Sequence, residues 1–318
     1  MEKRRQDKKH RHPLVIVNIM LLFACILAVI FLVVTAKQKH FDLSIKGIQS
    51  ALQQTSSEQA KTKKSTTSTS KESQQTSSAS HASKTKTTWT KQTDPVKVPI
   101  LMYHAIHVMD ASESASANLI VDPTTFESHI KRLVDEGYYF LSPEEAYRAL
   151  TKNELPAKKV VWLTFDDGNE DFYTIAYPIM KKYGVKATNN VITGFVQEGR
   201  NSNLTIDQML EMKANGMSFQ SHTVNHPDLS TKSADSQASE MSEAKSFLDE
   251  KLSQDTIAIA YPSGRYNSDT LTQAASSYKL AVTTNEGIGE ASDGLLSLDR
   301  IRILPTTTAD DLISTISN

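Results

Sequence analysis

Two short clusters of carboxylates and imidazoles in this chain could carry chemistry. The apolar run VVWLTF leads directly into Asp166, Asp167 and Gly168. Further along, the run SFQS leads into HTVNHP, which places His222 and His226 four residues apart. One carboxylate and two neutral imidazoles form a ligand set that suits a divalent transition metal, zinc above all, and leaves coordination open for water. The second aspartate would then be free to act as a general base.

Each cluster alone has a plainer explanation. An Asp-Asp-Gly sequence also fits a polar turn, and two histidines at this spacing also fit a helix surface or coincidence. Together, however, they supply a complete metal-ligand set and a base, and both follow predicted strands. No HExxH, GxSxG or P-loop pattern competes for the assignment. The combination therefore indicates metal-assisted hydrolysis.

The elements that must position these residues have the pattern of βα units. From about Pro95 onward, apolar runs of four to seven residues alternate with stretches of helical periodicity. About seven such units predict an α/β fold, a distorted (β/α) barrel whose active site lies at the carboxyl ends of its strands. The expected strands are Ile100–Tyr103, Val160–Phe165, Thr188–Ile192, Ser218–Ser221, Ile257–Tyr261, Ala281–Thr284 and Arg300–Leu304.

Three helices have clear start signals. Asp122 and Ser142 each precede a proline, an arrangement typical of the first helical turn. Thr205 precedes the stretch IDQMLEMKANG, in which Gly216 can serve as the stop.

The ordered motifs TFDDG, HTVNH and YPSGRYN resemble the polysaccharide deacetylase family, carbohydrate esterase family 4, also called the NodB homology domain. The resemblance spans roughly residues 97–304. It implies that Asp166 is the catalytic base and that Asp167, His222 and His226 bind the metal. It further implies that the segment Tyr261, Pro262, Ser263 and Gly264 lines the substrate groove, with the Ser263 N–H stabilising the oxyanion.

The chain departs from the family pattern in two places. Most members carry an arginine two residues before the groove proline, where this chain has Ala260, so another residue must orient the base; Arg300 is the first candidate. Many members also place the acid histidine late, but no histidine follows His226 here. The run VPILMYHAI instead resembles the branch that acts on poly-N-acetylglucosamine, which makes His104 the expected proton donor. The alternative is that His104 lies at a strand end with its hydrogen bonds satisfied and donates no proton. We expect His81, His107 and His129 to be surface residues without a role.

The residues before this domain predict a membrane anchor. Residues 1–13 form a basic leader, and residues 14–36 contain no charge and are long enough for a transmembrane helix. The leader is expected to stay in the cytoplasm, so that the chain crosses the cell membrane once and exports its remainder. A cleaved signal peptide is the alternative, although the apolar run is longer than its usual 7 to 15 residues. Residues 37–52 form a juxtamembrane segment, and the Ser-, Thr- and Lys-rich residues 53–94 predict a disordered stalk before the domain at 95–318.

The composition of the predicted domain limits the kinds of partner that it can bind. Residues 99–318 carry 18 Lys and Arg against 30 Asp and Glu, a net charge of -12, which argues against nucleic acid and favours a neutral substrate. Cys25, the only cysteine, lies in the predicted transmembrane helix, so the domain can have no internal disulfide.

The combined hypothesis is a membrane-anchored, extracytoplasmic N-deacetylase that acts as a monomer. It would use one divalent metal ion, Zn²⁺ or else Co²⁺ or Ni²⁺, and release acetate from N-acetylglucosamine units of a glycan. Poly-N-acetylglucosamine, peptidoglycan and chitin-like oligomers all remain candidate polymers. The alternatives are an O-acetyl polysaccharide esterase and a catalytically silent glycan-binding module. The intact set of two aspartates and two histidines disfavours the silent module, because binding alone requires neither a base nor an open metal site.

Overall fold

The structure, a computed structural model, describes residues 87–317. The predicted leader, transmembrane helix and juxtamembrane segment lie outside the described residues, as does the stalk up to residue 86, together with Cys25 and His81. Within the described range, no helix is both long and apolar enough to cross a membrane. The folded domain includes residues before 95, since β1 (Thr90–Lys91) pairs with β7 (Glu154–Leu155).

Seven parallel strands close into a barrel, as the sequence predicts. Each pairs with the next, and the last pairs with the first. In spatial order the strands are β3 (Ile100–Tyr103), β8 (Val160–Asp167), β9 (Thr188–Val191), β10 (Ser218–Ser221), β11 (Ala258–Ala260), β12 (Leu280–Glu286) and β14 (Leu298–Arg302). An eighth strand, β6 (Tyr139–Phe140), adds to β8. Strand β8 is two residues longer than expected, because Asp166 and Asp167 pair in register with β9.

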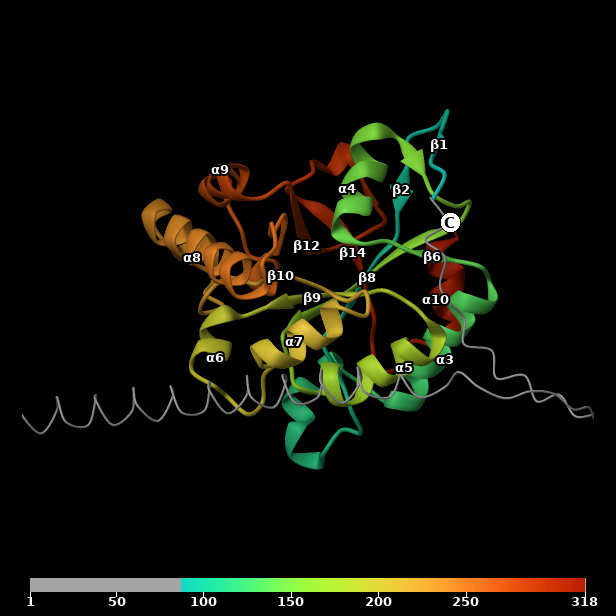
Figure 1. Cartoon of the computed structure of the whole chain (residues 1–318), viewed down its shortest axis with the longest axis horizontal. Helices are drawn as coiled ribbons and strands as arrows, with labels where there is room; N and C mark the ends of the chain where they lie inside the picture. Colours follow the sequence, from blue (N-terminus) through green and yellow to red (C-terminus); the bar gives the residue numbers. More distant parts are fainter. Residues whose placement is uncertain (1–86, 318) are drawn as a thin grey trace, which may run out of the picture. The chain divides into compact units, whose positions relative to one another are not determined.

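Helices surround this sheet, with α3 beside α10 and α8 beside α9 (Figure 1). The α-helices are α3 (Pro123–Asp135), α4 (Pro143–Lys152), α5 (Tyr177–Tyr183), α6 (Thr193–Gln197), α7 (Ile206–Lys213), α8 (Ala234–Leu252), α9 (Ser268–Ser277) and α10 (Ala309–Ile316). Short helical turns are η1 (Ala111–Leu119), η2 (Phe172–Ala176), η3 (Leu229–Thr231), η4 (Pro262–Gly264) and η5 (Ala291–Asp293). The remaining strands are β2 (Lys97–Val98), β4 (Ala105–Ile106), β5 (Ile120–Val121) and β13 (Gly289–Glu290).

The predicted helix starts are confirmed. The Asp122 side chain accepts a hydrogen bond from the Thr124 N–H, and Ser142 and Thr205 each form a capping box. Helix α7 ends at Lys213, and Gly216 follows with a φ of 95° that favours glycine.

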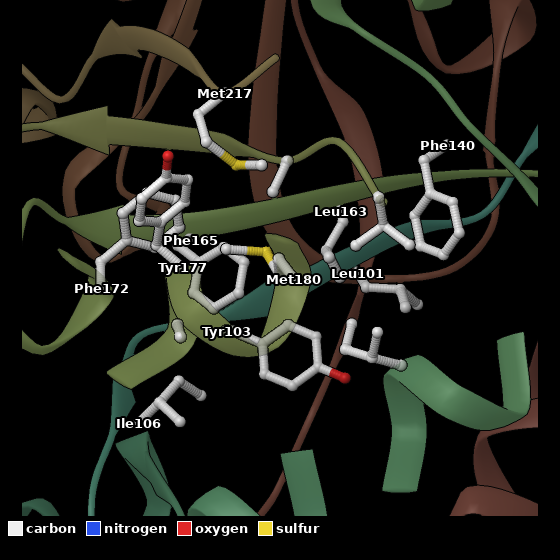
Figure 2. Close-up of a cluster of buried hydrophobic side chains, with 14 of the residues drawn as sticks. Leu101, Tyr103, Ile106, Phe140, Leu163, Phe165, Phe172, Tyr177, Met180 and Met217 are labelled. Atoms are coloured by element: carbon white, nitrogen blue, oxygen red, sulfur yellow. The ribbon is translucent and has the colours of Figure 1, made fainter. Parts of the chain in front are cut away.

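Alternation along β8 separates the barrel interior from the surrounding helices. Trp162 belongs to an inner cluster with residues of β11, β12 and β14, and its indole N–H donates to Thr188 Oγ1 at 2.8 Å. Leu163 and Phe165 point the other way, into the core beneath the helices, where Phe165 stacks on Tyr103 and meets Phe172 edge-on (Figure 2). Because successive side chains of a strand face opposite sides, Asp166 projects into the barrel like Trp162.

The expectation that His129 is a surface residue is wrong. His129 is completely buried; its Nε2–H donates to the Thr307 carbonyl at 2.8 Å, and its Nδ1 accepts from the Tyr103 hydroxyl at 3.0 Å. It lies on α3 three residues after Phe126 and next to Ile130, so it shares the inward face of that helix.

A buried ion pair joins β8 and β14 inside the barrel. The Arg300 guanidinium on β14 donates from Nη1 to Asp166 Oδ1 at 3.0 Å and from Nη2 to Asp166 Oδ2 at 2.7 Å. Arg300 also donates to the Thr283 carbonyl and the Thr164 hydroxyl, and neither charged side chain is more than 3% exposed. Burial by itself raises the pKa of Asp166, but the Arg300 charge outweighs it and holds that pKa far below its ordinary value. Asp166 is therefore ionised at neutral pH.

Replacing Arg300 by methionine should destabilise the fold by about 3–5 kcal/mol, because it leaves an uncompensated buried carboxylate. Urea unfolding in the presence of a chelator measures this free energy. Adding Asp166→Asn to Arg300→Met should recover part of the loss, because no buried charge then remains. Since the folded pKa of Asp166 lies below its unfolded value, the stabilisation by the pair is present above about pH 4 and is lost only in stronger acid. A loss below about 1 kcal/mol for the single variant would contradict a strong pair.

Candidate metal centre and catalytic site

The carboxyl ends of neighbouring parallel strands bring the two predicted clusters together. Strand β9 pairs with β8 on one side and with β10 on the other. Asp166 and Asp167 end β8, and His222 directly follows β10. The ends of parallel strands meet at one edge of a sheet, so residues distant in sequence become neighbours there.

Asp167, His222 and His226 form a group that could hold a metal ion. One ligand atom from each lies within 4.8 Å of the others. Asp167 Oδ1 is 3.4 Å from His222 Nε2 and 3.8 Å from His226 Nε2. The Nδ1–H of His222 donates to the Ala260 carbonyl at 2.8 Å, which leaves the Nε2 lone pair directed to the group. One carboxylate and two imidazoles so arranged fit a divalent transition metal.

The backbone is strained at two of these three candidate ligands. Asp167 has a φ of 80° and His226 a φ of 55°, and Thr223 between the histidines has a φ of 66°. Non-glycine residues rarely adopt this left-handed region, and they do so mainly where a site requires it. The His226 N–H donates to Thr223 Oγ1 at 3.0 Å, and Asn203 Nδ2 donates to the Asp167 carbonyl at 3.1 Å. These bonds hold the unusual turns in place.

The charges at the centre move the two histidine pKa values in opposite directions. Burial lowers the pKa of His222, but the hydrogen bond to Asp167 and the charges of both aspartates raise it overall. Burial lowers the pKa of His226, and the neighbouring His222 lowers it further. A metal ion binds neutral imidazole, so protons compete with metal mainly at His222.

His104 lies near the two aspartates, whose charges act on it. It directly follows β3, whose last residue, Tyr103, pairs with Phe165, the residue before Asp166. Burial lowers the pKa of His104, while the nearby Asp166 and Asp167 oppose that effect. His104 and Asp167 both line a cavity of about 360 Å³ that opens at this edge of the barrel.

Arg300, proposed from the sequence as the residue that orients the base, makes the two-pronged contact with Asp166 described above. Sequence reasoning missed Asn190, whose Nδ2 donates to Asp166 Oδ1 at 2.8 Å. Two polar residues in the buried strand sequence TNNV are the signal that could have identified it.

The groove segment begins where β11 ends, one residue after the carbonyl that fixes His222. The Tyr261 side chain points away from the metal group, into a cluster beneath α8 and α9, where its hydroxyl donates to the Leu296 carbonyl. Only its backbone can therefore contribute to the groove. Pro262, Ser263 and Gly264 form η4, in which Ser263 has a φ of 53°. Gly264 has a φ of 66°, and a Cβ there would lie 1.9 Å from Thr284 Oγ1, so this position requires glycine.

His107, which we expected on the surface without a role, is partly exposed and lines the same cavity. Its Nδ1 contacts Asp171 Oδ2 at 2.8 Å, and its Nε2 lies 3.2 Å from both carboxylate oxygens of Glu113. Although burial lowers the pKa of His107, these hydrogen bonds raise it overall. Glu170 also lines the cavity, and its lining contains no lysine or arginine. Sequence reasoning missed these three carboxylates.

Comparison with known proteins agrees with this geometry. The family described as polysaccharide deacetylase matches residues 153–282, a range that includes both aspartates, both histidines and the groove segment. A protein of Bacillus subtilis (strain 168), YxkH, named as a polysaccharide deacetylase, is 41% identical over 220 residues, which are 69% of this chain and 76% of the relative. The poly-beta-1,6-N-acetyl-D-glucosamine N-deacetylase of Staphylococcus aureus (strain MRSA252) is 35% identical over 173 residues, 51% of this chain and 59% of the relative.

Among solved structures, the deacetylase PplD of Streptococcus pyogenes, in complex with acetate, is 64% identical to this chain. The match has a TM-score of 0.69 and covers 70% of this chain and 99% of the solved one. This chain therefore belongs to the polysaccharide deacetylase family and is a hydrolase of that class.

Proposed function

We propose that this chain is a metal-dependent N-deacetylase that removes acetyl groups from N-acetylglucosamine units of an extracellular or cell-wall polysaccharide and releases acetate. The main support is that the ionised, arginine-paired Asp166 directly precedes Asp167, which groups with His222 and His226 and also lines the cavity.

Asp167, His222 and His226 would hold the metal ion, for which zinc is the first choice and cobalt or nickel the alternatives. When bound there, the ion supplies a Lewis acid that lowers the pKa of water and polarises the acetamide carbonyl. The tautomer of His222 is already set for this task by its hydrogen bond to the Ala260 carbonyl.

Asp166 acts as the general base. The Arg300 and Asn190 hydrogen bonds fix its carboxylate and keep it ionised, so it is ready to accept a proton from the attacking water. Its strongly lowered pKa makes it a weak base, and it can therefore deprotonate only water that the site has made more acidic. This dependence explains why the base must adjoin the metal ligands.

His104 and Ser263 complete the reaction. Hydroxide adds to the acetamide carbon, and the N–H of Ser263 would donate to the oxyanion that forms. His104 then gives a proton to the departing nitrogen as the carbon–nitrogen bond breaks, which yields acetate and a free amine. The place of His104 directly after β3, near Asp166 and Asp167, supports this role.

The cavity favours an uncharged amino-sugar polymer. Glu113, Glu170 and Asp171 line it without any lysine or arginine, and a field of this sign repels anionic substrates. Peptidoglycan carries carboxylates on its peptides, whereas poly-N-acetylglucosamine is neutral and becomes cationic as it is deacetylated. We therefore place poly-N-acetylglucosamine ahead of peptidoglycan. The resemblance to the Staphylococcus aureus enzyme gives this order further support.

The direct test is acetate release by the full-length chain from a panel of N-acetylated polymers. We expect release from N-acetylglucosamine polymers, loss of release in a chelator, and recovery when zinc is restored. Faster release from an O-acetylated glycan than from any N-acetylated one would instead favour an esterase.

Matched variants divide the roles within this experiment. Asp166→Asn should abolish turnover but retain bound metal, whereas Asp167→Asn and His222→Ala should lose metal, as measured by elemental analysis. The reverse pattern would overturn these assignments.

Replacing His104 by alanine should lower the rate of amide hydrolysis by about 10²–10⁴-fold, the usual contribution of a general acid. Hydrolysis of an activated aryl acetate should change much less, because its leaving group departs without a proton. His107→Ala, in the same cavity, is the control and should lose less than tenfold. Equal losses on both substrates would show that His104 is not the proton donor.

We also propose that residues 14–36 anchor the chain in the cell membrane, with the catalytic domain outside; the uncharged run and basic leader support this. On intact cells, an epitope after residue 318 should be open to added protease and one before residue 1 should be protected. Protection of both epitopes would contradict the export of the domain.

A further inference from the structure

Glu240 of α8 holds the loop between the two histidine ligands. Its Oε2 accepts hydrogen bonds from the Val224 N–H at 2.9 Å and the Asn225 N–H at 2.8 Å. Its Oε1 accepts a third from Asn225 Nδ2 at 2.8 Å. One carboxylate thus engages two consecutive backbone donors and one side chain in a loop of three residues.

Helix α6 holds the same loop from the opposite side. The Thr193 N–H donates to the Thr223 carbonyl at 3.1 Å, and the Gly194 N–H donates to the Val224 carbonyl at 2.8 Å. A Cβ at Gly194 would lie only 2.6 Å from the Val224 oxygen, so this approach requires glycine. The loop is therefore fixed through its carbonyls on one side and its N–H groups on the other.

This loop needs restraint because its backbone is strained. Thr223 has a φ of 66° and His226 a φ of 55°, and a β-branched residue such as threonine is especially unfavourable there. A loop without external bonds would relax toward ordinary backbone angles. Because the strained residues flank the loop and one of them is a ligand, that relaxation would move His226 Nε2 away from Asp167.

The contacts of Glu240 differ from those of the paired charged residues near the end of α8. Lys245 pairs with Asp249 and Asp255, and Lys251 pairs with Glu250. Across residues 87–317, no ion pair within 4 Å involves Glu240, whose hydrogen bonds all go to the histidine loop. Its carboxylate is therefore committed to that loop.

We propose that Glu240 is a positioning residue of the metal centre: its three hydrogen bonds hold the 223–226 turn so that His226 meets Asp167 and His222 around one ion. The proposal rests on the metal binding of the proposed function. Residues that orient metal ligands typically change metal affinity by about 10–100-fold when they are replaced.

The experiment compares zinc affinity of the full-length chain with Glu240→Gln, measured by competition with a chromophoric chelator. The matched control is Glu243→Gln, the same change at an exposed position on the same helix. We expect Glu240→Gln to bind zinc about 10–100-fold more weakly and Glu243→Gln to bind it like the unmodified chain. Saturating zinc should restore most of kcat to Glu240→Gln, because Asp166 and His104 are untouched.

A second variant tests the clamp from its other side. Gly194→Ala places a methyl group against the Val224 carbonyl and should also weaken zinc binding, even if Glu240→Gln does not fold. Thermal unfolding of the metal-free proteins should be similar for Glu240→Gln, Glu243→Gln and the unmodified chain.

Equal zinc affinity of Glu240→Gln and Glu243→Gln would overturn the proposal. So would a loss of metal-free stability large enough to explain the weaker binding, because Glu240 would then be a purely structural residue. Failure of the unmodified chain to bind zinc would overturn the proposed function itself, together with the role of Glu240. These outcomes separate the two claims.

Discussion

The site depends on keeping a carboxylate ionised inside a protein barrel. Burial alone would favour the neutral form of Asp166, and the Arg300 guanidinium, itself fully buried, reverses that preference. The pair is possible only because Arg300 also finds the Thr283 carbonyl and the Thr164 hydroxyl, so that its donors are shared among four acceptor atoms. The register of β14 against β3, and of β3 against β8, fixes these distances. The closed barrel is thus what allows Asp166, the proposed base, to stay ionised.

The proposed metal ligands obey a different constraint from Asp166, the proposed base. Asp166 is held by side chains within the barrel, whereas Asp167 and His226 lie where the backbone leaves the sheet in left-handed conformations. Hydrogen bonds to the surrounding loops hold these turns, notably those of Asn203, Thr223 and Glu240. The barrel interior is rigid, and hydrogen bonds from neighbouring loops fix the strained turns at its edge. Such an arrangement can direct several side chains to one point.

Sequence predicted the parts of this arrangement that have local signals. Apolar runs located the seven barrel strands, capping residues located three helix starts, and ordered motifs located both ligand clusters. Arg300 was predicted to orient the base because Ala260 stands where most members of the family carry an arginine. The features that the sequence did not reveal depend on tertiary packing. His129 lies on the inward face of α3. Nothing in the sequence separates Glu240 from the exposed Glu243 on the same helix.

The charges around the cavity fit the proposed reaction and the release of its products. The Arg300 charge cancels that of Asp166, and a divalent ion would more than cancel that of Asp167, so the catalytic edge would carry little net negative charge. Glu113, Glu170 and Asp171 add negative charge to the cavity lining, where His107 contacts Glu113 and Asp171. The effect of burial on the pKa of His104 is opposed by Asp166 and Asp167, although that pKa stays below its ordinary value. In the proposed reaction, the negative charge of the lining would attract the amine product, which carries a positive charge, and would repel acetate, so that the same carboxylates would separate the two products.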